Sequence, residues 1–160
     1  MGAVIKKLPV YVSVDPGLKG AVCALLPDKQ MALFMDTTEQ PETILNWLQR
    51  LKSEYDLRVI MIENVHAIQG TSAKSNFSFG FNTGAITAIA RCTGVTVDTV
   101  NPKKWQKHCG VKPKEKQLKK AVAEICGKLY PKVVVKGPKG GLLDGKSDSL
   151  MIAHYARSLY

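Results

Sequence analysis

The stretch YVSVDPGLKGAVCAL, residues 11–25, places an acid between two apolar runs that read as neighbouring β-strands. Asp15, Pro16 and Gly17 are common turn residues, so a hairpin turn accounts for the pattern without any function. The alternative is that a carboxylate at the end of a buried strand is held rigidly, as a metal ligand has to be. Acidic partners elsewhere in the chain are needed to decide between these two interpretations.

The composition is that of one soluble globular domain. The 160 residues are 45% hydrophobic and 22% charged, which is enough to bury a core without disulfides. No apolar run approaches the roughly 20 residues that a membrane helix requires, and the N-terminus lacks a signal peptide's long apolar core. We therefore expect a cytoplasmic protein with no membrane partner and no organic cofactor.

The four cysteines are scattered and form no CxxC pair, so we expect reduced residues that pack as small hydrophobic groups. A zinc site that joins His108 and Cys109 to a distant partner lacks the usual ligand spacing. No metal is predicted there.

Positive charge is concentrated in one quarter of the chain. The formal net charge is +10, and residues 101–140 hold twelve lysines against two acids. A solvated face would normally intersperse both signs, so this segment favours contact with a polyanion such as DNA. The predicted DNA-binding residues are Lys104, Lys107, Lys112, Lys114, Lys116 and Lys119.

Periodicity predicts an α/β fold with a mixed sheet and helices on its faces. The expected elements are strands at 9–15, 19–26 and 30–35, a helix started by Pro41 after the period changes at Glu39, a strand at 58–64, a helix at 77–92, a strand at 93–100, a short helix after Asn101, a long helix within 113–130, an exposed loop at 132–146 and a closing helix capped by Ser147. The first three strands are expected to form an antiparallel meander.

Apolar spacing predicts which helix faces are buried. Two buried stripes are expected, at Ile44, Trp47, Leu48, Leu51 and Tyr55 and at Leu118, Ala121, Val122, Ile125 and Leu129. Three small residues four apart, Gly80, Gly84 and Ala88, would let the helix at 77–92 closely approach the sheet or a second subunit.

Three further acids are candidate partners for Asp15. Glu63 ends the expected buried strand at 58–64, and Asp144 and Asp148 lie four apart at the start of the closing helix. Together the four form an all-oxygen set suited to Mg²⁺ or Mn²⁺. Two such ions about 4 Å apart can activate a water and stabilise the leaving oxygen in phosphodiester cleavage. The alternative is four surface acids that never meet.

Several motifs resemble the RuvC family of Holliday junction resolvases, within the RNase H-like superfamily. The resemblance spans essentially the whole chain and rests on VSVDPGLKGAVCAL, MIENVHA, GVKPKEKQLKKAV and SDSLMIAHYA. FSFGFNTG and NPKKWQK look most like the phage-encoded branch. The resemblance implies a single RNase H-like domain over residues 1–160, with a mixed five-stranded sheet and helices on both faces.

The function that the resemblance implies is a dimeric, metal-dependent endonuclease that nicks symmetric strands of four-way DNA junctions. Asp15, Glu63 and Asp148 fall on family metal ligands. In the cellular pattern the last two acids are three apart, whereas position 145 here is glycine, so Asp144 is assigned as the fourth ligand. Lys116 matches a basic residue that the family places near the scissile phosphate.

A second basic residue at the phosphate has no firm register, and Lys104 or Lys107 are the candidates. His66 is either a DNA contact or without a role, and His154 is expected to pack. The aromatic residues Phe77, Phe79 and Phe81 are either core or a wedge that unstacks bases.

Other functions remain open on the same residues. They are a broader branched-DNA debranching nuclease, a ribonuclease that cuts RNA:DNA hybrids, and a non-catalytic junction-binding protein.

Overall fold

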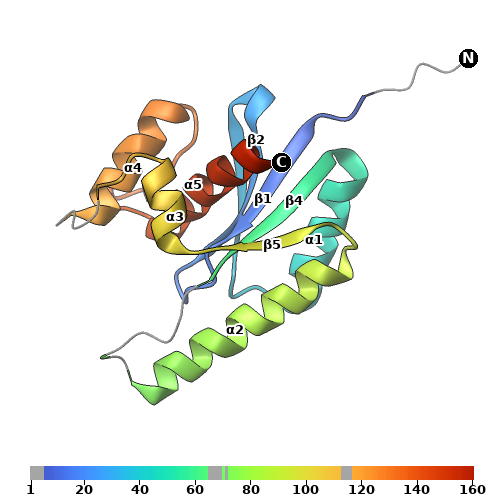
Figure 1. The fold of residues 1–160 in the computed structure, drawn as a ribbon, viewed down its shortest axis with the longest axis horizontal. Helices are drawn as coiled ribbons and strands as arrows, with labels where there is room; N and C mark the ends of the chain where they lie inside the picture. Colours follow the sequence, from blue (N-terminus) through green and yellow to red (C-terminus); the bar gives the residue numbers. More distant parts are fainter. Residues whose placement is uncertain (1–5, 65–69, 71, 113–116) are drawn as a thin grey trace, which may run out of the picture.

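A mixed five-stranded sheet forms the centre of the computed structural model, which describes residues 6–64, 70, 72–112 and 117–160 (Figure 1). The strand order is β3-β2-β1-β4-β5, with β2 antiparallel to β1 and β3, and β4 parallel to β1 and β5. The strands are β1 (Pro9–Val14), β2 (Ala21–Leu26), β3 (Met31–Asp36), β4 (Asp56–Glu63) and β5 (Val97–Val100). The predicted meander and mixed sheet are confirmed.

Helices cover both faces of the sheet, as predicted (Figure 1). They are α1 (Pro41–Glu54), α2 (Ala73–Cys92), α3 (Pro102–His108), α4 (Leu118–Leu129) and α5 (Asp144–Leu159), with a short 3₁₀ turn η1 (Pro27–Lys29) between β2 and β3. Pro41 and Pro102 occupy the first turns of α1 and α3, where a missing N–H leaves no intrahelical hydrogen bond unmade. Asn101 caps α3 by accepting a hydrogen bond from the Lys103 N–H, at 3.0 Å.

Strand alternation divides the core into two layers. Tyr11, Cys23 and Met61 face α3, α4 and α5, whereas Val12 and Ile60 face α1 and α2. α5 packs directly on β1 and β2 and carries eight buried residues. The strand ends and the start of α5 are therefore held in one rigid unit.

Some boundaries and faces differ from the sequence predictions. α5 begins at Asp144, so Ser147 is not its N-cap but lies in its first turn, with its hydroxyl donating to the Asp144 carbonyl at 2.9 Å. Leu118 and Leu129 are 36% and 42% exposed because α4 turns Val122 and the residues beside it toward the core instead. α2 begins at Ala73, four residues earlier than expected, since the Ser72 hydroxyl caps it.

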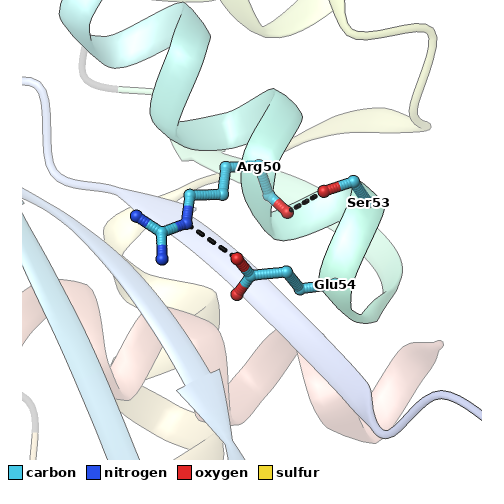
Figure 2. A network of polar contacts seen from close by, with 3 residues as sticks. All are labelled: Arg50, Ser53 and Glu54. Atoms are coloured by element: carbon cyan, nitrogen blue, oxygen red, sulfur yellow. Dashed lines mark hydrogen bonds and ion pairs between the residues drawn. The ribbon is translucent and has the colours of Figure 1, made fainter.

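The end of α1 carries a surface ion pair. Arg50 Nε donates to Glu54 Oε1 at 2.7 Å, and the Ser53 hydroxyl donates to the Arg50 carbonyl (Figure 2). Both charged side chains are exposed to water, which screens the pair, so it contributes little to stability. Trp47, on the same helix, is partly buried against the core, as predicted.

Among the described residues, no helix combines the length and apolar character needed to cross a lipid bilayer.

Candidate active site

The turn between β1 and β2 uses Asp15 in both of the ways that its sequence allows. Its carboxylate Oδ1 accepts a hydrogen bond from the Gly17 N–H at 3.0 Å, which is a turn role, and its N–H donates to the Ala21 carbonyl. The same carboxyl is mostly buried, and that burial raises its pKa. The hairpin interpretation is therefore correct for the backbone turn. It does not explain why a desolvated carboxyl group stands at the end of β1.

Glu63 lies at the end of β4 and is 8% exposed. Its Oε1 accepts a hydrogen bond from the indole Nε1 of Trp105, on α3, at 2.7 Å. Burial raises the pKa of Glu63 to about 7, with a further increase from Asp15, while the indole hydrogen bond opposes the change. A second strand thus ends on a desolvated carboxyl group, as the sequence predicted.

The first turns of α5 supply Asp144 and Asp148. Burial raises the pKa of Asp148 to about 7, followed by repulsion from Asp15, Glu63 and Asp144. Asp144 is more exposed and pairs with Lys119 at the start of α4.

The electrostatic repulsion among these carboxyl groups indicates that the acids of β1, β4 and α5 lie near one another. They are therefore not four unrelated surface acids. Within residues 6–64, 70, 72–112 and 117–160, however, no three acidic, His or Cys side chains are grouped closely enough to hold a metal ion as they stand. One oxygen each of Asp15, Glu63 and Asp144 is engaged by a protein donor. The carboxylates are therefore neighbours but not an assembled ligand set.

Two glycines bring the β1–β2 turn into backbone contact with α5. Gly20 and Gly145 form a parallel β-bridge where the β1–β2 turn meets the first turn of α5. A Cβ at position 145 would overlap the carbonyl oxygen of Lys19 and lie 2.7 Å from Gly20 Cα. No side chain, and therefore no acid, fits at position 145 while the turn and the helix stay in contact.

Two hydroxyl groups fix this junction of turn and helix. Ser13, on β1, donates to the Ser149 carbonyl of α5, and Thr37 donates to the Gly17 carbonyl at 3.0 Å. Both side chains are buried. They connect β1, the β1–β2 turn and α5, and so hold Asp15 and Asp148 on one rigid framework.

Four of the predicted DNA-binding lysines are described, and all four are exposed. Lys104 and Lys107 lie on α3, Lys112 follows it, and Lys119 begins α4. The other predicted positions, Lys114, Lys116 and His66, lie outside the described residues. α3 and α4 both pack on α5, so these lysines lie on or beside the helices that flank the helix carrying Asp144 and Asp148.

Cysteine and histidine side chains take structural positions. Cys23 and Cys126 are buried and Cys109 partly buried, as expected, whereas Cys92 is exposed at the end of α2. The His154 ring bonds the Tyr130 hydroxyl through Nδ1 at 2.7 Å, which agrees with the packing role predicted for it.

The exposed side of α2 carries the predicted small residues. Gly80, Gly84 and Ala88 line a shallow groove together with Thr83 and Arg91, and they face away from the sheet. On another side of the same helix, Phe77 and Phe81 are 75% and 69% exposed, whereas Phe79 is partly buried. The core interpretation is therefore wrong for Phe77 and Phe81.

The two raised carboxyl pKa values predict that the metal-free protein loses stability as pH rises. Glu63 and Asp148 titrate near 7 in the folded protein and at 4.5 and 3.8 ordinarily, so between about pH 4 and 7 the folded state holds protons that the unfolded state has released. Glu63 contributes up to about 3 kcal/mol and Asp148 up to about 4 kcal/mol, present at pH 4 and lost by pH 8. In EDTA, thermal melting should be higher at pH 5 than at pH 8.

The control for this prediction is the Glu63→Gln, Asp148→Asn double variant, in which neither group titrates. Its melting temperature should vary less between pH 5 and pH 8 than that of the wild-type protein. Equal pH dependence in both proteins would show that these carboxyl groups are not desolvated.

Comparisons with known proteins bear on the fold. Neither a protein-family model nor a curated protein sequence matches the chain. Among solved structures, RuvC of Thermus thermophilus in complex with a Holliday junction substrate aligns with a TM-score of 0.60 at 14% identity, over 94% of this chain and 95% of that one. A second structure of Thermus thermophilus RuvC gives a TM-score of 0.56 at 18% identity, with the same coverage.

The yeast mitochondrial Holliday junction resolvase Ydc2 aligns with a TM-score of 0.51 at 14% identity, over 92% of this chain and 76% of that one. The chain therefore has the RuvC-like, RNase H-like fold that its motifs predicted. The likeness to the phage-encoded branch stays a prediction.

Proposed function

We propose that this protein is a metal-dependent, structure-selective DNA endonuclease that resolves four-way junctions by paired nicks. The observation that carries the proposal is the convergence of desolvated acids from β1, β4 and α5 beside lysine-bearing helices. Solved structures with the same fold are Holliday junction resolvases, one of them in complex with junction substrate. Polyanion attraction and a carboxylate cluster in one small domain are both needed by a nuclease.

The donor chemistry of the cluster fits Mg²⁺ or Mn²⁺, because all four side chains offer hard oxygens and their mutual repulsion is relieved by a divalent cation. Asp15, Glu63, Asp144 and Asp148 would hold the metal after their side chains rotate toward one another. Two bound ions would supply an activated water and stabilise the leaving oxygen. The protein contributes rigid strand and helix ends that orient these carboxylates.

The lysines are proposed to bind the DNA backbone. The affinity for DNA would come from five lysines and would fall as the salt concentration rises; they are Lys104, Lys107, Lys112, Lys114 and Lys119. The shape of the junction would select it over other DNA. Lys116 is proposed to contact the scissile phosphate. Lys119 is a second candidate for that contact, and its ion pair with Asp144 supports this choice.

A homodimer is part of this proposal, because a junction with two-fold symmetry presents equivalent strands to two equivalent subunits. The exposed groove along Gly80, Gly84 and Ala88 supports α2 as the interface, since a second helix can approach closely where side chains are small.

Phe77 and Phe81 are proposed to stack on bases near the crossover. Exposed aromatic rings provide sequence-tolerant platforms for unpaired bases. Both rings line a groove that also contains Leu18, from the β1–β2 turn that holds Asp15.

Cleavage of matched substrates tests the function. A four-way junction, a flap, a linear duplex and an RNA:DNA hybrid are incubated with the protein in Mg²⁺ and in EDTA. We expect symmetric nicks in the junction alone, and only with Mg²⁺. Preferential flap cleavage would support a debranching nuclease and hybrid cleavage a ribonuclease. Junction binding without any nick would support a non-catalytic binding protein.

Asp144 and Asp148 are predicted to differ in importance. Asp148→Asn should abolish cleavage, since its carboxyl lies buried among the other acids. Asp144→Asn should lower it less, because Asp144 is partly exposed and already pairs with Lys119. Cleavage rates at saturating Mg²⁺ measure both effects.

Lys119→Met separates the two possible roles of Asp144. A metal ligand loses activity on Asp144→Asn even when Lys119 is absent, whereas a mere ion-pair partner does not. Full activity of Asp144→Asn would remove Asp144 from the ligand set.

A further inference from the structure

Trp105 makes a specific contact with one of the proposed metal ligands. Its indole N–H donates to Glu63 Oε1 at 2.7 Å, and the two residues are 1% and 8% exposed. Among the described residues, Trp105 is the only one whose side chain donates a hydrogen bond to Glu63. The pairing joins residues 42 positions apart, from β4 and α3.

The indole is held firmly in place. β5 pairs with β4 so that Val100 lies opposite Glu63, and the Asn64 N–H donates to the Val100 carbonyl at 2.8 Å. Asn101 and Pro102 then turn the chain directly into α3, whose buried side carries Trp105 into the core layer under α5. The backbone that holds Glu63 is therefore bonded to the segment that leads to Trp105.

A buried carboxylate requires such a donor. Glu63 is 8% exposed, and a buried carboxylate oxygen without a hydrogen-bond donor is strongly disfavoured, so the indole N–H stabilises this side chain where it lies. Indole only donates, so it pairs with a carboxyl oxygen and cannot itself bind a cation. The contact uses Oε1 and leaves Oε2 as the oxygen that the indole does not engage.

We propose that Trp105 is a positioning residue, whose N–H fixes Glu63 Oε1 and thereby presents Oε2 to a divalent cation. This inference rests on the proposed metal-dependent function and adds a residue that does not itself touch metal or DNA. Groups that orient metal ligands typically change metal affinity by about 10–100-fold when they are removed. α3 thus has two roles, with Lys104 and Lys107 exposed to DNA and Trp105 bonded to the cluster.

An isosteric replacement tests the N–H by itself. The chain contains two tryptophans, so Trp47→Phe leaves Trp105 as the single site for tryptophan analogues. Trp47→Phe protein is produced with tryptophan or with benzothienylalanine, in which sulfur replaces the ring N–H with nearly unchanged shape. Mn²⁺ dissociation constants are measured for both proteins by the electron paramagnetic resonance signal of free Mn²⁺. We expect binding at least about tenfold weaker with the analogue.

Two further readouts separate positioning from folding. The melting temperature in EDTA and the affinity for a four-way junction in EDTA should be the same with either side chain at position 105. Junction cleavage by the analogue protein should recover when Mn²⁺ is raised.

Equal Mn²⁺ affinity in the two proteins would overturn the role of Trp105 and, if the wild-type protein cleaves junctions, would leave the proposed function standing. A fall in melting temperature together with junction affinity would assign the effect to folding and also overturn the proposal. A wild-type protein that neither binds Mn²⁺ nor cleaves would refute the proposed function, and the inference with it.

Discussion

Asp15→Asn is expected to abolish junction cleavage and to leave folding and junction binding intact. Asparagine keeps a side-chain oxygen that can accept the Gly17 N–H, so the turn between β1 and β2 is preserved. It removes the charge from the carboxyl that interacts electrostatically with Glu63, Asp144 and Asp148. Metal ions supply several kcal/mol of transition-state stabilisation, so the rate should fall by about 10³-fold or more.

The measurement is single-turnover cleavage of a labelled four-way junction in Mg²⁺, beside junction affinity in EDTA. Asp28→Asn is the matched control, because Asp28 is an exposed acid in the η1 turn with the same change of charge. Its cleavage rate should equal that of the wild-type protein. Full cleavage by Asp15→Asn would return this residue to a purely structural turn role and would remove the basis of the nuclease proposal.

The sequence predicted the structure best where a local pattern of residues determines the local backbone. Asp15 and Glu63 follow or end apolar runs, and strands that are parallel neighbours in a sheet bring such ends together. Asp144 and Asp148 both lie in the first turns of α5, and their four-residue spacing puts them on one side of that helix. The strands and the order of the helices thus followed from local patterns and from the family resemblance, whereas the role of the four acids as metal ligands stays a prediction.

Features that depend on contacts between distant segments were not predicted. Trp105 reads in sequence as one apolar residue in a basic helix, and nothing local indicates that its indole reaches Glu63. Serine is a residue type that favours the N-cap, but α5 begins three residues before Ser147, at Asp144. The exposure of Leu118 reflects how α4 is rotated on α5, which helical spacing alone does not determine.

Glycine stands at position 145, where the spacing expected from the RuvC resemblance would put an acid, and the structure gives a steric reason for a glycine there. The chain brings the β1–β2 turn and α5 into backbone contact at Gly20 and Gly145, which leaves no volume for a side chain. Conformational freedom is not the cause, since Gly145 is not among the glycines with a positive φ. Close packing of the two backbones therefore leaves no room for a side chain at position 145.

Gly145→Ala is expected to have the largest effect on stability. The added methyl group would overlap the Lys19 carbonyl and lie within 3 Å of two Gly20 backbone atoms, and both elements are anchored in the core. Overpacking against rigid backbone costs about 3 kcal/mol, the upper end of the usual range. For a chain of this size the melting temperature should fall by roughly 6–12 °C. Thermal unfolding followed by circular dichroism measures the change.

Gly127→Ala is the matched control, because Gly127 lies within α4 and a Cβ there would meet no atom within 4 Å. That substitution should raise stability by about 0.5–1 kcal/mol through the helix propensity of alanine. Gly145→Asp would place an acid at the family spacing of three, but we expect it neither to fold stably nor to rescue Asp144→Asn. Wild-type stability of Gly145→Ala would mean that the turn and α5 are not in backbone contact, and the steric reason for a glycine at position 145 would then be lost.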